Sequence, residues 1–374
     1  MKLLITMGQA DMSLEHHIKP IIAVSEIEEI FIIRDKAGPA LDKVTYIFPP
    51  KWSIKFPILK TILKFALLFR TAAREKPILI HGYLLFPYGI MSYLVGKLNG
   101  IKIGLSLIAG PVELFMPFGG SPIGKYAYKS TLPRISGINR ILLYITQNMD
   151  FITTTGSFTQ KFLISNKVSK HKIFIIPHIV DDRFMPLNAE KKYDVIYIGR
   201  LAKVKHVETF VRAIAKARVS LPYIRAAIVG DGPEKKYLRL LSKELGLDEN
   251  LHFAGYQSDV WNWYNEAKIS VLTSEREGFP YSVMESLSCG VPVITTNCGD
   301  VTDIVKNGYN GVIIEDYTQH QLLSEAIVKM LIDPKTLREY SERASYIKNI
   351  NPTVTKRWIK VFSLLNNGHN PISQ

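Results

Sequence analysis

The sequence predicts an α/β protein with two domains, each built on a doubly wound parallel sheet. Three observations support this fold class. The chain has 374 residues, of which 47% are hydrophobic, so it can bury two sizeable cores. Short apolar runs typical of buried strands alternate with helix-like stretches. The alternation stops once, around residues 177–192, where turn residues and a polar stretch replace it, and then starts again.

The predicted first domain spans residues 1–186. Buried strands that are separated by helices favour a parallel sheet covered on both faces. We expect its strands at Lys2 to Thr6, Glu29 to Ile33, Pro77 to Ile80, Ile101 to Leu107, Phe151 to Thr155 and Lys172 to Ile176.

The predicted second domain spans residues 187–350. In open α/β sheets, ligands bind beyond the carboxyl ends of the strands, so the loops that follow these strands are the places to search for a site. We expect strands at Tyr193 to Ile198, Ala226 to Val229, Leu251 to Ala254, Ile269 to Thr273 and Val291 to Thr295, and helices at His206 to Ser220, Glu234 to Leu245, Val260 to Ala267 and Pro280 to Ser288.

The net charge of +14 is concentrated in the first half of the chain. Residues 1–190 carry 23 basic and 13 acidic residues, and within them residues 43–76 carry eight basic residues and one acidic residue. A second stretch, residues 114–149, has no acid. The charge is not accompanied by a nucleic-acid-binding module, so we do not expect nucleic acid as a partner.

The segment 56–70 is predicted to form a basic amphipathic helix. Lys60 and Lys64 lie four residues apart on one face, and an anionic membrane surface attracts such a helix through its charge and its apolar area. An ordinary surface helix packed on the first domain is an equally good interpretation. The apolar face is expected to contain Leu59, Ile62, Leu63, Ala66 and Leu67.

The two cysteines and the N-terminus indicate the compartment. Cys289 and Cys298 form no Cys-x-x-Cys pair and lie in a predicted core, which favours a reduced protein without disulfides. Residues 1–7 turn polar too soon for a signal peptide, and no apolar run is long enough to span a bilayer. We therefore expect a cytoplasmic protein, peripheral on the inner face of the cell membrane.

The stretch from Glu277 to Glu285 is the most informative part of the sequence. We expect Pro280 to be the first residue of a helix, so that the free amides of residues 281–283 point at an anion. Carboxylates beside this helix start accept hydrogen bonds from sugar hydroxyls, while the amides hold phosphate. A sugar joined to a diphosphate satisfies both groups. Taken alone, this spacing also fits an amphipathic helix with two solvated glutamates.

A second motif follows the first strand of the second domain. Gly199 permits a close turn, and Arg200 and Lys205 bring two cations to the end of that strand. A leaving nucleoside diphosphate gains negative charge as its bond to the sugar breaks, and fixed cations at that position lower the barrier. Two unconnected surface cations are the alternative.

Together, Glu277-x7-Glu285 with the Gly-Val-Pro-Val run at 290–293, and Gly199-Arg-Leu-x-x-x-Lys205, resemble the retaining group 1 glycosyltransferases (glycosyltransferase family 4). The resemblance implies the GT-B fold, in which two Rossmann-like domains face each other across a cleft. It implies transfer of a hexose or amino sugar from a nucleoside-diphosphate sugar to a glycan or lipid-linked acceptor, in cell-surface polysaccharide or glycolipid synthesis. The sequence has no Asp-x-Asp pair, and the resemblance implies catalysis without a metal or other cofactor.

The resemblance also assigns roles to residues. Glu285 is expected to bond the ribose of the donor, and Glu277 the transferred sugar. His81 lies in a segment similar to the family's His-x-His strand end, although a satisfied core histidine is another interpretation. The implied catalytic residues are Arg200, Lys205, Glu277 and His81, and the implied donor-binding residues are Gly8, Gly199, Gly230, Gly255, Phe279, Pro280, Tyr281, Ser282, Val283 and Glu285.

Two alternatives keep this fold but change the activity. One is a nucleotide-sugar epimerase or hydrolase. The other is a catalytically inactive donor-binding subunit, which is consistent with Ala109, because many family members carry histidine at that position. In proteins of this family the last helix commonly crosses back to the first domain, and residues 351–374 are expected to form this helix and a tail.

Overall fold

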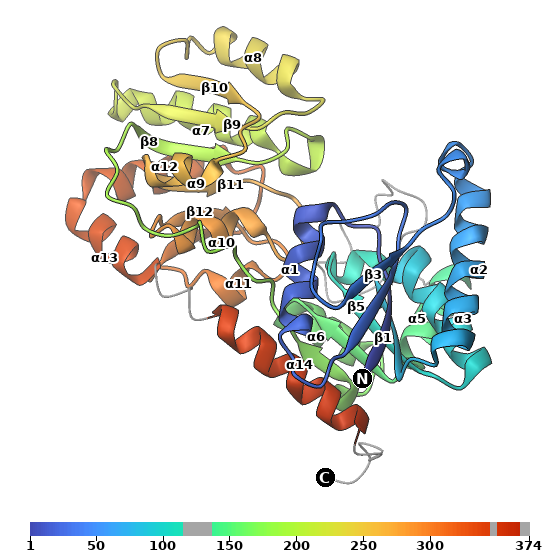
Figure 1. Cartoon of the computed structure of the whole chain (residues 1–374). Coiled ribbons are helices and arrows are strands. Elements are labelled where there is room, and N and C mark those ends of the chain that lie inside the picture. Colours follow the sequence, from blue (N-terminus) through green and yellow to red (C-terminus); the bar gives the residue numbers. More distant parts are fainter. Residues whose placement is uncertain (115–136, 345–349, 367–374) are drawn as a thin grey trace. The chain divides into compact units, whose positions relative to one another are not determined.

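A computed structural model describes residues 1–114, 137–344 and 350–366 of the chain. The chain divides into two compact units (Figure 1). Unit 1 comprises Met1–Ile179 and Ile350–Gln374, and unit 2 comprises Val180–Asn349. The predicted break at residue 186 lies inside unit 2, and the last helix belongs to unit 1. The acid-free stretch 114–149 carries the cations Lys125, Lys129, Arg134 and Arg140, of which the first three lie outside the described residues.

Unit 1 is a parallel sheet of seven strands in the order β3-β2-β1-β4-β5-β6-β7. Successive side chains of a strand point to opposite faces, so Leu3 and Ile5 pack on one face while Leu4 packs on the other. The strands are β1 (Lys2–Thr6), β2 (Glu29–Ile33), β3 (Val44–Ile47), β4 (Leu79–Tyr83), β5 (Lys102–Leu107), β6 (Phe151–Thr154) and β7 (Ile173–Ile175).

Helices cover both faces of this sheet. Figure 1 shows α1 and α14 on one side and α2 and α3 on the other, and the core clusters agree, because Trp358 packs with Leu3 and Leu68 packs with Leu4. The helical elements are α1 (Asp11–Ile22), η1 (Lys51–Lys55), α2 (Pro57–Glu75), η2 (Leu85–Gly89), α3 (Ile90–Asn99), η3 (Gly110–Leu114), α5 (Gly137–Gln147), α6 (Ser157–Ser165), η4 (Lys170–Lys172) and α14 (Ile350–Asn366).

Unit 2 is a parallel sheet of six strands in the order β10-β9-β8-β11-β12-β13. Its main core lies between this sheet and two helices, α7 and α12. The strands are β8 (Tyr193–Ile198), β9 (Ala226–Val229), β10 (Leu251–Gly255), β11 (Ala267–Leu272), β12 (Val293–Thr296) and β13 (Gly311–Ile314), and the helical elements are η5 (Lys203–Lys205), α7 (Val207–Ser220), α8 (Lys235–Glu244), α9 (Val260–Asn265), α10 (Tyr281–Ser288), α11 (Val301–Ile304), α12 (His320–Ile332) and α13 (Pro334–Ala344).

The predicted fold class is confirmed, with local corrections. Strands β1, β2, β8 and β9 have the predicted bounds, whereas β3 and β13 are strands that the sequence did not predict. The predicted helix from Val260 ends at Asn265, because Ala267 already begins β11. The prediction that Pro280 is the first helical residue is wrong by one position: Pro280 is the N-cap, with extended backbone angles, and α10 begins at Tyr281.

Candidate functional site

The loops at the carboxyl ends of β8, β9 and β10 pack tightly against one another. The Gly199 amide donates to the Val229 carbonyl at 3.0 Å, and the Gly230 amide donates to the Gly255 carbonyl at 2.7 Å. A Cβ on Gly230 would lie 2.0 Å from the Gly199 carbonyl oxygen, and Gly230 has a φ of 144°. The backbone approach at this position therefore requires glycine. Three predicted residues, Gly199, Gly230 and Gly255, are brought together here.

Lys205 and Glu277, both predicted from the sequence, meet in an ion pair. Lys205 ends the short helix η5 after β8, and its ammonium group contacts Oε1 of Glu277 from the loop after β11. The hydroxyl of Ser274 donates to the same oxygen at 2.6 Å, and Thr273 donates to the backbone carbonyl of Lys205 at 2.8 Å. These contacts hold the two loops together at the edge of the sheet where ligands bind in open α/β folds.

Arg200 lies in the turn that follows β8, as Lys205 does, and its charge acts on the buried Tyr197. Burial raises the pKa of the Tyr197 phenol, the charge of Glu277 raises it further, and the guanidinium of Arg200 lowers it. Burial raises the pKa of the Cys298 thiol to about 12, with Glu277 adding to the rise and Lys205 opposing it. The charge of Glu277 thus acts on both buried residues, that of Arg200 on Tyr197 and that of Lys205 on Cys298.

A buried loop supports Glu277 from behind. The amide of Asp300 donates to the Gly278 carbonyl at 2.9 Å, and Phe279 is buried. Gly299 has a φ of 57°, and a Cβ there would lie 2.3 Å from the carbonyl oxygen of Glu277. The loop before α10 is thus fixed by a second glycine contact, which orients the carboxylate toward Lys205.

Glu285 lies on α10 and is partly buried. The hydroxyl of Tyr264 donates to its Oε2 at 3.3 Å and to the carbonyl of Ser282 at 3.0 Å. Burial raises the pKa of Glu285 to about 7, the bond from Tyr264 lowers it, and the nearby carboxylate of Asp181 raises it. The amide of Val283 donates to the Pro280 carbonyl at 3.2 Å, so the prediction that this amide is free is wrong.

Two predicted residues belong to unit 1. His81 lies on β4, is only 2% exposed, and bonds the Ser106 hydroxyl at 2.7 Å through Nε2. Its ring stacks on Phe151 with 5.4 Å between centroids, and burial lowers its pKa to about 3, so it is neutral. These surroundings are those of a packed core histidine. The amide of Gly8 donates to the side chain of Gln9 at 3.1 Å.

Several supporting residues were missed by the sequence-based reasoning. Ser274 stands three residues before Glu277 and could have been found by its place in that loop. Tyr264 could not be recognised from the sequence, because its contact with Glu285 depends on how α9 packs on α10. Glu113 is a buried carboxyl that accepts the amides of Leu85 and Ala109 at 2.8 and 2.7 Å, and burial raises its pKa to about 8. The sequence feature that could have drawn attention to Glu113 is its isolation in an acid-poor stretch.

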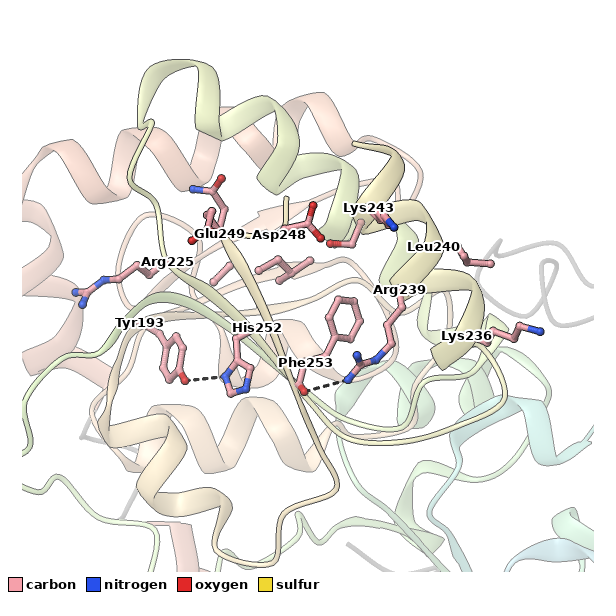
Figure 2. A pocket seen from close by; sticks show the side chains of 14 residues that line it. Tyr193, Arg225, Lys236, Arg239, Leu240, Lys243, Asp248, Glu249, His252 and Phe253 are labelled. Carbon is pink, nitrogen blue, oxygen red and sulfur yellow. Dashed lines mark hydrogen bonds between the residues drawn. The ribbon is translucent and has the colours of Figure 1, made fainter. Parts of the chain in front are cut away.

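A pocket of about 790 Å³ lies elsewhere on unit 2, between α8 and β10 (Figure 2). Tyr193 and Arg225 reach it from the amino ends of β8 and β9, and Tyr193 bonds His252 at 2.9 Å. None of the predicted site residues lines it. Because ligands of parallel sheets bind at the carboxyl ends, we assign the functional site to the Lys205–Glu277 region and not to this pocket. Within the described ranges, no cluster of three or more His, Cys, Asp or Glu could hold a metal ion.

The sequence is similar to known glycosyltransferases. Residues 180–346 match the family model "Glycosyl transferases group 1". Poly(glycerol-phosphate) alpha-glucosyltransferase of Bacillus subtilis is 28% identical over 247 residues, which cover 64% of this chain but only 36% of that protein. N-acetyl-alpha-D-glucosaminyl L-malate synthase of Bacillus anthracis is 24% identical over 73% of this chain and 70% of its own length. The capsular polysaccharide biosynthesis glycosyltransferase CapM of Staphylococcus aureus is 26% identical over 80% and 78%.

Solved structures share the fold along nearly the whole chain. HepE of Anabaena, crystallised in complex with UDP, has a TM-score of 0.74 and 16% identity, covering 97% of this chain and all of that one. Sucrose-phosphate synthase from Thermosynechococcus elongatus has a TM-score of 0.74 and 18% identity, covering 98% of this chain. At these identities the likeness shows the architecture, two parallel α/β sheets with covering helices.

Proposed function

Because the chain belongs to the group 1 glycosyltransferases and has their GT-B fold, we propose that it is a retaining enzyme that moves a hexose or amino sugar from a nucleoside-diphosphate sugar to a glycan or lipid-linked acceptor. We place this reaction in cell-surface polysaccharide or glycolipid synthesis, as the name of the related CapM suggests. The observation that carries the proposal is the meeting of Lys205 and Glu277, with Arg200 nearby, at the carboxyl ends of the unit 2 strands.

The Lys205–Glu277 pair explains how a donor could be recognised. Without a ligand, each charge is satisfied by the other. A diphosphate carries more negative charge than one carboxylate, so it draws the ammonium of Lys205 and the guanidinium of Arg200 to its oxygens. Glu277, still held by Ser274, can then accept hydrogen bonds from sugar hydroxyls. Donor binding and the correct placement of Glu277 are thereby coupled.

The same cations assist bond breaking in the proposed reaction. The bond between the sugar and the diphosphate breaks while the acceptor oxygen attacks from the same face, and a leaving phosphate oxygen takes the acceptor's proton. Arg200 and Lys205 stabilise the charge that develops on the diphosphate, which is the role that a divalent metal has in other enzymes. We therefore propose that transfer proceeds without a metal, so that activity persists in a chelator such as EDTA.

Glu285 is proposed to bind the ribose of the donor nucleotide. Its side chain keeps part of its surface in solvent and accepts a hydrogen bond from Tyr264, whose hydroxyl is also held by the carbonyl of Ser282. An ionised carboxylate accepts hydrogen bonds from both hydroxyls of a diol. HepE has been crystallised with UDP-glucose, which makes a UDP-sugar the first donor to test.

Substitution of the two cations tests the assignment. Arg200→Ala or Lys205→Ala should each lower turnover by about 100-fold, as expected for losing one group that stabilises the transition state. Lys203→Ala is the matched control, since Lys203 is exposed on the same turn as Lys205. A thermal-shift series with UDP-, GDP- and ADP-sugars identifies the donor, and nucleotide release with envelope extract as acceptor measures turnover. A folded double variant with the wild-type rate would refute the assignment.

The same experiment separates the alternative functions. Consumption of the donor with no acceptor present would indicate an epimerase or hydrolase. Donor binding without any turnover would indicate an inactive donor-binding subunit, which Ala109 favours. In this fold Ala109 offers only its amide to Glu113, so no titratable side chain is present at that position.

A lipid-linked acceptor would bring the enzyme to a bilayer surface. In the part of the chain that the structure describes, the helices are too short or too polar to cross a membrane. We propose that the protein is cytoplasmic and binds peripherally to the inner face of the cell membrane, and that the contact is made by unit 1.

A further inference from the structure

Helix α2 has the opposite orientation from the one that its sequence predicts. The expected polar face carries Lys60 and Lys64, but the side chain of Lys64 is only 3% exposed. Its ammonium group lies 2.7 Å from Asp35 and over the ring of Tyr88 at 4.8 Å, while Lys60 lies 2.6 Å from the other oxygen of Asp35. The helix thus packs its basic side on unit 1, where Leu68 completes the contact.

The carboxylate of Asp35 compensates part of the charge of these two lysines. Burial would raise the pKa of Asp35, but hydrogen bonds from Lys60 and Lys64 outweigh it, and the pKa is lowered. The carboxylate is therefore ionised at neutral pH and compensates one of the two positive charges. Because both ammonium groups point at Asp35, the face of α2 that carries Lys60 and Lys64 is not the face that it presents to solvent.

The outward face of α2 is apolar instead. Ile58 is 80% exposed, and Ile62 and Phe69 follow it at positions that fall within about 40° of it around a helix of 3.6 residues per turn. The short helix η1 and its junction with α2 add further exposed aromatic and aliphatic side chains. We call the whole set the apolar stripe: Trp52, Ile54, Phe56, Ile58, Leu59, Ile62 and Phe69.

Exposed cations stand at both ends of the apolar stripe. Lys51 and Lys55 lie at the η1 end, Arg70 and Arg74 lie toward the end of α2, and residues 43–74 contain no acid. Exposed apolar groups in a continuous row mark an interaction surface. Aliphatic side chains along a helix, aromatic residues at its end and cations at both borders are the arrangement of a helix that lies in a membrane interface.

A second copy of the chain fits this surface less well. A symmetric dimer through the apolar stripe would bring the same patch of each copy together, including its bordering lysines and arginines. Like charges at the rim oppose such a contact, and the described part of the stripe offers no acidic residue to compensate them. Lipid headgroups with phosphate supply the missing negative charge.

We infer that α2 lies in the plane of the bilayer and inserts the apolar stripe at the boundary between headgroups and acyl chains, with Lys51, Lys55 and Arg70 against lipid phosphates. This inference rests on the proposed membrane-borne acceptor. It assigns most of the binding free energy to the insertion of apolar side chains, and the preference for anionic lipid to charge. Trp52 is the natural reporter, because it is 58% exposed in the free protein.

Vesicle flotation of the full-length protein tests the insertion. Wild-type protein should float with phosphatidylcholine vesicles containing phosphatidylglycerol and should keep measurable binding in high salt. The double variant Ile58→Ser/Ile62→Ser should lose at least about tenfold in the partition coefficient, since each exposed isoleucine contributes apolar area. Val219→Ser is the matched control, because Val219 is 84% exposed on α7 of unit 2. Equal flotation of the double variant and this control would overturn the inference.

Trp52 gives a second, independent measurement. Its emission should shift to the blue on vesicle binding and should be quenched by brominated lipid, with Trp52→Phe providing the background of the other tryptophans. If the emission of Trp52 does not shift when the protein is bound to vesicles, the inference of insertion is overturned. A wild-type oligomer that Ile58→Ser/Ile62→Ser dissociates would show that a second copy covers the stripe, which also overturns it. Thermal stabilisation by UDP-glucose, measured on the same variants, reports donor binding separately, so failure of the membrane inference and failure of the proposed function are distinguishable.

Discussion

Replacement of Glu285 by glutamine is expected to stabilise the protein at high pH while it abolishes donor binding. Burial raises the pKa of this carboxyl from 4.5 to about 7. The unfolded chain releases the proton near pH 4.5, whereas the folded protein keeps it until about pH 7. Ionisation therefore favours the unfolded state as the pH rises through this window, and the folded protein loses stability.

The magnitude follows from the size of the shift. One pKa unit corresponds to about 1.4 kcal/mol, and because Glu285 retains some contact with solvent we assign about 2 kcal/mol to its ionisation. Glu285→Gln removes this cost and can keep the hydrogen bond from Tyr264. At pH 8 the variant should unfold about 4 to 8 °C above wild type, given that unit 2 has the size of a domain of 150–250 residues. Near pH 5 most of this difference should vanish.

Thermal unfolding at pH 5 and pH 8, with and without UDP-glucose, measures both effects. Glu249→Gln is the matched control, because Glu249 is an exposed glutamate of the same unit. The reasoning about burial fails when Glu285→Gln changes the melting temperature equally at both pH values or lowers it at pH 8. The assignment of Glu285 to the donor fails when the variant is stabilised by UDP-glucose as much as wild type is.

Two further predictions concern the glycine turns and the buried histidines. Gly230→Ala should lose about 2 kcal/mol or more of unfolding free energy, because its Cβ would lie 2.0 Å from the Gly199 carbonyl, whereas Gly137→Ala, with nothing within 4 Å, should change little; equal denaturant midpoints would contradict this. Burial lowers the pKa of His81 to about 3 and that of His178 well below 6.5, so unit 1 should lose stability as the pH falls below about 6.5. Hydrogen exchange in β4, corrected for intrinsic rates, measures this loss, and protection that does not fall from pH 7 to pH 5 would count against it.

The fold was predictable because the strands of both sheets are local, buried apolar runs. β1 and β8 are predicted to the residue, since each is a run of apolar side chains bounded by polar or turn residues. The unpredicted strands β3 and β13 are edge strands of four residues with several half-buried side chains, so the apolar run in each is short or interrupted. These segments are extended because each pairs with one neighbouring strand, and a local sequence pattern does not contain this information.

The candidate site was predictable where the chemistry is carried by residues close in sequence. Glu277 and Glu285 share one loop and helix, and Gly199 to Lys205 share one turn. The environment of Glu285 was not predictable, because it comes from Tyr264 on another helix and from Asp181 at the start of the unit. The orientation of α2 was not predictable for the same reason. A helical pattern groups residues by face, but Asp35, 25 residues before Lys60, decides which face is covered.

Two charged groups of the donor site, Lys205 and Glu277, are already paired in the ligand-free protein. Lys205 is paired with Glu277, and Glu277 is bonded by Ser274. Donor binding must exchange these contacts for contacts with the diphosphate and the sugar, so only the surplus of the new interactions over the old appears as affinity. Either substitution removes the same ion pair, so the effects of Lys205→Ala and Glu277→Ala on donor affinity should be strongly non-additive.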